Sequence, residues 1–204
     1  MSGARSGLAQ LRIWLWAVGG VAVGATGILY LLPSEKPEPT PAESYANAFG
    51  GSFDMIDQNG KAVTDQTLRG KPYAIFFGFT RCPDVCPTTL SRMAALRKQL
   101  GAAGDKFEIV FVSVDRGHDK AKDIGEYVKL FNTPIIGLIG SDAQIARIVK
   151  AFHVYYAKVP IEGGDYTIDH TASVFLMDRD GKFVATIDHK EGQQVALEKL
   201  KRVL

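Results

Sequence analysis

The pattern of hydrophobic and polar residues divides the chain into three parts, of which the first is an uncharged apolar run. Residues 13–32 carry no charged side chain. A helix of that length, rising about 1.5 Å per residue, crosses a hydrocarbon core of about 30 Å. We therefore predict a transmembrane helix at 13–32, preceded by a cytoplasmic segment at 1–12 that carries Arg5 and Arg12. A cleaved signal peptide is the alternative, but no clear small-x-small cleavage site follows the run.

A proline-rich segment comes next, and we predict that residues 33–43 form an extended linker. The string PSEKPEPTP holds four of the nine prolines of the chain. Such a composition is typical of a semi-rigid spacer rather than of a packed element. The linker would hold the following domain, residues 44–204, away from the membrane surface.

Residues 44–204 alternate between strand and helix patterns. The continuous apolar runs Tyr73–Phe79 and Phe107–Val114 indicate strands that are covered on both faces. The same reasoning predicts strands at Phe53–Asp57, Lys61–Val63, Ile135–Ile139, Ser173–Met177 and Phe183–Ile187, and helices at Val85–Leu100, Asp119–Phe131, Ser141–Phe152 and Gly192–Val203. This alternation favours an α/β fold with a partly parallel central sheet and helices on both faces.

Composition and charge narrow the range of functions. A chain of 204 residues that is 46% hydrophobic has room for one ordinary domain and an appendage. Its net charge of +2 comes from Arg5 and Arg12, because the remaining acidic and basic side chains balance. A neutral domain without a basic run gives no reason to expect a nucleic-acid partner. The two cysteines are too few for a disulfide framework.

These two cysteines, Cys82 and Cys86, lie where a predicted buried strand gives way to a helix. A CxxxC spacing in helical geometry places both sulfurs on one face, and the helix N-terminus lowers thiol pKa values. Two such thiolates can bind one soft metal ion, Cu(I) or Zn(II), or form a redox-active disulfide. A peroxidase with one attacking thiolate is a third possibility. A purely structural disulfide is disfavoured, because so short a loop adds little stability.

A trigonal Cu(I) site needs one donor besides the two sulfurs, and four histidines compete for that role. His153 and His189 lie in sequence surroundings typical of surface residues. His118 follows a buried strand, so it could reach the same sheet edge as the cysteines. His170 is predicted in a loop just before an antiparallel strand, which can lie beside the end of a parallel neighbour. The spacing favours His170 and leaves His118 as a second candidate.

The motifs Gly78–Pro87, Val154–Tyr156 and Tyr166–Thr171 resemble the Sco/SenC family, and the likeness extends from about residue 45 to the end of the chain. The resemblance implies a thioredoxin-like fold with an N-terminal single transmembrane helix. It also implies a copper ion bound by Cys82, Cys86 and His170. The domain would then face the periplasm from the inner membrane, or the intermembrane space of a mitochondrion.

The resemblance further implies a membrane-anchored copper metallochaperone. Its partners would be other copper chaperones and cytochrome c oxidase subunit II, whose dicopper centre would receive the metal. The alternative is a thiol–disulfide oxidoreductase, with Cys82 and Cys86 as its redox-active pair, that keeps the partner's copper-ligand cysteines reduced. Asp84 or Asp169 could tune the site through its ligands.

One position departs from the family pattern. Members often carry a proline after the aspartate that ends the third strand, whereas here Asp115 is followed by Arg116. The loop at this position is therefore expected to differ in shape, and His118 within it is an extra donor without an assigned role.

Overall fold

Two apolar runs form the middle of the main sheet. Strands β3 (Tyr73–Gly78) and β4 (Glu108–Ser113) pair in parallel, and every residue of β3 is buried. Their register places Phe76 opposite Phe111, with both rings on the same face of the sheet. Burial of both strands on two faces explains why neither shows the alternation of a half-exposed strand.

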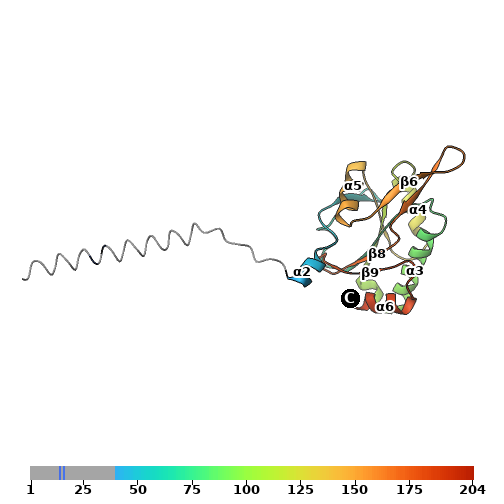
Figure 1. The fold of residues 1–204 in the computed structure, drawn as a ribbon. Helices are drawn as coiled ribbons and strands as arrows, with labels where there is room; N and C mark the ends of the chain where they lie inside the picture. Colours follow the sequence, from blue (N-terminus) through green and yellow to red (C-terminus); the bar gives the residue numbers. More distant parts are fainter. Residues whose placement is uncertain (1–13, 15, 17–39) are drawn as a thin grey trace, which may run out of the picture. The chain divides into compact units, whose positions relative to one another are not determined.

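The computed structural model describes residues 14, 16 and 40–204, and Thr40–Leu204 form one compact unit (Figure 1). The predicted transmembrane helix at 13–32 lies outside the described residues, apart from Trp14 and Trp16, as does most of the predicted linker. In the described part of the chain, no helix has both the length and the apolar character needed to span a bilayer. Helix α2 (Pro41–Ala46) begins within the segment predicted as linker, and the side chain of Thr40 caps it.

The main sheet has the strand order β2-β1-β5-β4-β3-β8-β9. Its other strands are β1 (Asp54–Asp57), β2 (Ala62–Thr64), β5 (Ile136–Ile139), β8 (Val174–Met177) and β9 (Phe183–Ile187). Strands β3, β4 and β5 are parallel, whereas β1 and β8 pair antiparallel to their neighbours at the two sides. The predicted mixture of parallel and antiparallel strands is confirmed.

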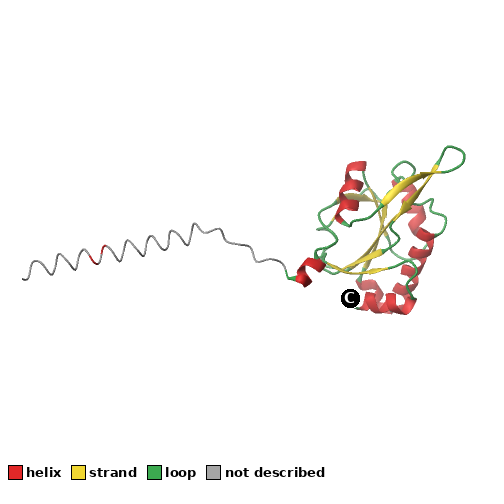
Figure 2. Ribbon diagram, in the orientation of Figure 1, coloured by secondary structure: helices red, strands yellow, loops and turns green. Residues whose placement is uncertain are grey.

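Helices cover both faces of this sheet (Figure 2). On the face of Phe111, α3 (Val85–Gln99) and α4 (Ala121–Lys129) pack, with Tyr127 of α4 against the Phe111 ring. On the opposite face, Phe152 at the end of α5 (Asp142–Ala151) packs against Phe77. The helix α6 (Gln193–Lys201) and the short 3₁₀ segment η1 (Gly101–Lys106) complete the unit.

A separate hairpin was not predicted from the sequence. Among the described residues, strands β6 (Tyr156–Pro160) and β7 (Tyr166–His170) pair only with each other, and Figure 1 shows their turn projecting beyond the main sheet. The expectation that His170 lies in a loop is therefore wrong, because it is the last residue of β7. Polar residues, Pro160 and the Gly163-Gly164 pair obscure the strand pattern in this stretch.

Close packing of α4 on β5 leads to a stability prediction. A methyl group added at Gly137 of β5 would collide with the side chain of Ile124 in α4. Gly137→Ala should therefore lower the free energy of unfolding by about 1–3 kcal/mol, measured by denaturant titration with far-ultraviolet circular dichroism.

Gly125→Ala, on α4 itself, is the matched control. Its added carbon would make only an ordinary contact, 3.6 Å from Gln58, and alanine favours a helix over glycine by about 1 kcal/mol. The control should raise stability. A loss of stability in both variants, or in neither, would contradict this packing.

Candidate metal centre

The two cysteines lie at the carboxyl end of β3, where the chain turns into α3. Cys82 belongs to the connecting loop and is partly exposed, whereas Cys86 is the second residue of α3 and is fully buried. Gly78, the last residue of β3, lies directly beneath Cys86: a Cβ atom at Gly78 would stand 2.6 Å from that sulfur. The absence of a side chain there makes room for the sulfur at the edge of the sheet.

His170 reaches the cysteines from the hairpin. Its Nε2 atom lies 3.4 Å from Sγ of Cys86, and the ligand atoms of Cys82, Cys86 and His170 all lie within 4.8 Å of one another. The Nδ1 atom is 3.0 Å from the carbonyl oxygen of Thr171. A neutral imidazole that donates from Nδ1 to this carbonyl keeps the Nε2 lone pair directed at the sulfurs.

The other histidines stay apart from this group of three. His118, the second candidate, has its Nδ1 atom 3.1 Å from Asp115 Oδ2 and 2.8 Å from Arg81 Nη2. Of the described residues, only Cys82, Cys86 and His170 form a cluster with metal-ligand spacing. The fold thus brings together the three residues that the family resemblance implied as copper ligands. Metal binding by these residues remains a prediction.

The two thiols differ sharply in acidity. A hydrogen bond from Cys86 is the main cause that lowers the pKa of Cys82 to about 3, and hydrogen bonds from backbone amides act in the same direction. One of those amides is the N–H of Cys86, 3.4 Å from the Cys82 sulfur. The same interaction with Cys82, followed by burial, raises the pKa of Cys86. The reduced pair therefore holds one thiolate and one thiol at neutral pH.

Two aspartates, Asp84 and Asp169, were proposed to tune the site. Within the described residues, neither carboxylate forms a hydrogen bond with the side chain of Cys82, Cys86 or His170. The Asp84 carboxylate accepts a hydrogen bond from the Thr88 hydroxyl. Asp169 is exposed, and alternation along β7 places it on the face opposite to His170.

Two sulfurs and one imidazole form a soft donor set of three. Metal–ligand distances of about 2.3 Å to sulfur and 2.0 Å to nitrogen place trigonal donors roughly 4 Å apart, a separation that small side-chain rotations can reach in this cluster. A structural zinc site takes four protein ligands. The three donors that converge in the described residues therefore fit Cu(I) better than structural zinc.

A buried carboxylate that sequence reasoning missed fixes the loop before Cys82. Asp119 accepts hydrogen bonds from the Thr80 amide at 3.1 Å, from the Thr80 hydroxyl at 2.6 Å and from the Ser113 hydroxyl at 2.5 Å. Only 1% of its surface is exposed. The signal in the sequence was an acidic residue shortly after a buried strand, where a charge must find partners.

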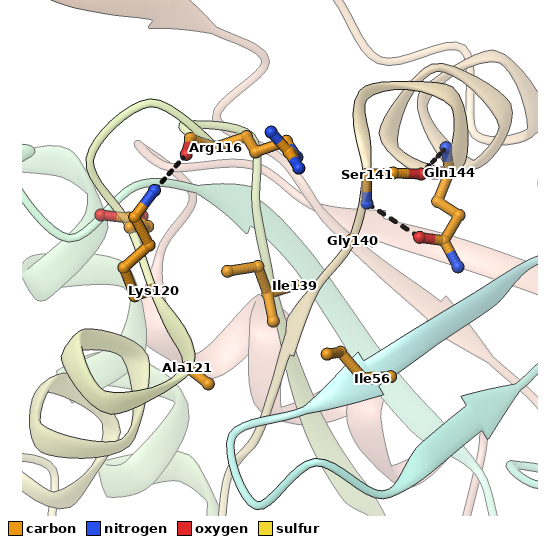
Figure 3. A pocket seen from close by; sticks show the side chains of 9 residues that line it. Ile56, Arg116, Lys120, Ala121, Ile139, Gly140, Ser141 and Gln144 are labelled. Atoms are coloured by element: carbon orange, nitrogen blue, oxygen red, sulfur yellow. Dashed lines mark hydrogen bonds between the residues drawn. The ribbon is translucent and has the colours of Figure 1, made fainter.

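A cavity of about 310 Å³ lies beside this carboxylate. Figure 3 shows Arg116 and Lys120 on one side of it and Ser141 and Gln144 on the other. The side chains of the latter pair are committed to capping α5. None of the described residues that line the cavity carries a sulfur or an imidazole, so it is distinct from the candidate metal centre.

Comparison with known proteins places these features in context. The family model described as SCO1/SenC matches residues 41–204. The chain is 40% identical over 139 residues to the protein sco1 of Schizosaccharomyces pombe, covering 66% of this chain and 53% of that protein. It thus spans about half the length of that relative.

Two solved structures are similar across most of the chain. ScoI of Bradyrhizobium japonicum, solved with copper bound, is 46% identical with a TM-score of 0.71, covering 76% of this chain and 99% of that one. BsSco, described as having a disulfide switch and as a member of the Sco family of cytochrome c oxidase assembly proteins, is 27% identical with a TM-score of 0.59, covering 75% and 91%. These similarities support the predicted thioredoxin-like α/β fold.

The acidity of Cys82 leads to a testable pH dependence. Because a lowered pKa means that the thiolate is lost only when the pH falls through that low value, the reduced chain should keep the ultraviolet absorbance of one thiolate from about pH 8 down to about pH 5. Cys82→Ser should abolish this absorbance. Cys86→Ala should move its loss to higher pH, because the thiol that donates to Cys82 is removed and no other donor replaces it. Loss of the native absorbance between about pH 9 and pH 8, as for an ordinary thiol, would contradict this assignment.

Proposed function

Because this chain belongs to the SCO1/SenC family, we propose that it is a copper metallochaperone that binds one copper ion through Cys82, Cys86 and His170. The observation that carries the proposal is the convergence of two sulfurs and one imidazole nitrogen within 4.8 Å. The copper-bound state of the Bradyrhizobium japonicum relative supports the choice of metal. In this role copper is cargo, held for transfer to another protein.

The three metal-ligating side chains differ in solvent exposure, which suits a site that must transfer its metal ion to another protein. Cys82 is partly exposed, so an acceptor thiolate can approach the ion from that side and replace one ligand at a time. The hydrogen bond with Cys82 and burial raise the pKa of Cys86, so the free protein holds a thiol there. That thiol must lose its proton when copper binds. Copper loading should therefore fall as the pH is lowered, since protons compete for the sulfur and the imidazole.

The acceptor we propose is cytochrome c oxidase subunit II, with its dicopper centre as the destination and other copper chaperones as further partners. The description of BsSco as one of the cytochrome c oxidase assembly proteins supports this proposal. We further propose that residues 13–32 anchor the chain in the inner membrane, with residues 44–204 in the periplasm or its mitochondrial equivalent. The uncharged run and the preceding arginines support this topology.

A second function, thiol–disulfide exchange, is favoured by the thiolate character of Cys82. The Cys82 thiolate would attack a disulfide of the partner to form a mixed disulfide. Cys86 would then attack Cys82, forming the Cys82–Cys86 disulfide and leaving the partner with two thiols. Both cysteines are free in this structure, as that reaction requires at its start.

Titration with Cu(I) in competition with a chelator tests the proposed ligand set. The reduced full-length chain should bind one equivalent, and His170→Ala should weaken binding by at least about tenfold, since even indirect partners of metal ligands often contribute that much. His189→Ala is the matched control, because it removes an imidazole outside the donor group and should leave the affinity unchanged.

The same variants separate the two functions. Disulfide exchange needs the two sulfurs but not the imidazole, so an oxidoreductase would keep its turnover in His170→Ala. Equal copper affinity in the native chain and in His170→Ala would contradict the metallochaperone proposal.

A further inference from the structure

The candidate metal centre is divided between two segments that share no strand pairing. Cys82 belongs to the loop after β3 and Cys86 to the start of α3, whereas His170 belongs to the β6–β7 hairpin, which pairs with no strand of the main sheet. A two-stranded hairpin is at best marginally stable alone. Contacts with the body of the domain must therefore fix its angle, and with it the position of His170.

Alternate residues of β7 face the body of the domain. Ile168 is 5% exposed and belongs to the hydrophobic core, and His170 lies beside Cys86. Tyr166 shares this face, because side chains two residues apart point the same way. It lies at the far end of the strand from His170, about 13 Å away at the usual rise per residue. A contact at Tyr166 is thus well placed to fix the tilt of the hairpin.

Tyr166 is bound to a buried carboxylate. Its hydroxyl donates to Asp115 Oδ1 at 2.5 Å, and the Asp115 side chain is completely buried. The Tyr166 ring packs against the His118 imidazole, with centroids 4.9 Å apart. The neighbouring Gly117 leaves space for this contact, because a Cβ atom there would collide with the Tyr166 hydroxyl.

Arg81 ties the same end of the hairpin to the cysteine loop. It precedes Cys82 in the chain, and its guanidinium donates to Asp165 Oδ2 at 2.7 Å and to the Tyr166 carbonyl at 3.2 Å. It also reaches Asp115 Oδ2 at 3.4 Å. Arg81 therefore links the segment that carries one sulfur to the strand that carries the imidazole.

We propose that these five residues, the clasp formed by Arg81, Asp115, His118, Asp165 and Tyr166, hold His170 in place opposite the two sulfurs. Tyr166 and Arg81 are then positioning residues of the proposed copper site, and this inference rests on the function proposed above. Asp115 is the fixed point of the clasp. Its buried carboxylate contacts Arg81, Tyr166 and His118, and separating a buried charge from its partners is costly. The clasp also gives His118 a role that does not involve binding metal.

A double-mutant cycle tests the proposal. Cu(I) affinity is measured by chelator competition on the reduced full-length chain, for the native protein, Tyr166→Phe, His170→Ala and the double variant. Tyr166→Phe should weaken binding about tenfold, in the range found for residues that orient metal ligands. In the His170→Ala background the same change should have no effect, because no imidazole remains to be positioned.

Two further variants sharpen the test. Tyr155→Phe is the matched control, because it also removes a tyrosine hydroxyl beside this hairpin. The Tyr155 residue is 62% exposed, and its hydroxyl makes no hydrogen bond within the described residues. Copper affinity should therefore not change in this variant. Gly117→Ala displaces the Tyr166 hydroxyl by steric collision and should reproduce the effect of Tyr166→Phe. Without metal, the amides of β7 should exchange hydrogen faster in Tyr166→Phe, whereas those of β3 should be unchanged.

Three results would overturn the proposal. Native affinity in both Tyr166→Phe and Gly117→Ala would show that the clasp does not position the imidazole. An equal loss in the native and His170→Ala backgrounds would show that Tyr166 acts only through general stability. Native affinity in His170→Ala alone would instead remove the imidazole from the ligand set, and the function proposed above would fail with the clasp.

Discussion

The separation of 3.4 Å between His170 Nε2 and Cys86 Sγ depends on how the β6–β7 hairpin is held against the carboxyl edge of the main sheet. The hairpin brings the imidazole to a sulfur that lies 84 positions earlier in the chain. Phe76 and Phe79 flank the imidazole edge-on, with ring centroids 5.9 Å away in each case, and limit its movement. The soft donor set is therefore a product of the tertiary structure, and the CxxxC motif supplies only two of its three atoms.

Two buried aspartates in the segment after β4 organise both halves of this arrangement. Asp119 binds Thr80 and so fixes the loop that leads to Cys82, whereas Asp115 binds Tyr166 of the hairpin. The Asp119 amide donates to the Asp115 carbonyl at 2.8 Å, so both carboxylates belong to one turn of the chain. The segment that carries the Cys82 sulfur and the hairpin that carries the His170 imidazole are thus both held by the same turn of the chain. This common support reduces the rearrangement needed when a metal binds.

The sequence was most informative where the chain is buried on two faces. The apolar runs around Phe76 and Phe111 predicted β3 and β4, and the position of Cys86 at a strand-to-helix junction predicted a functional edge. The hairpin was missed because its outer face is exposed and its turn is rich in glycine, so hydrophobic periodicity is weak. His170 therefore followed from the family resemblance more than from spacing. The role of His118 could not be predicted, because it depends on contacts with distant segments.

Two sulfurs and one imidazole nitrogen are proposed to hold the copper ion, and X-ray absorption at the copper edge of the Cu(I)-loaded, reduced full-length chain tests this most directly. We predict two sulfur neighbours at about 2.3 Å and one nitrogen neighbour at about 2.0 Å, the latter with the outer-shell scattering of an imidazole ring. A site with sulfur neighbours alone would contradict this ligand set. So would a site with a single sulfur, since the reduced cysteines converge as a pair.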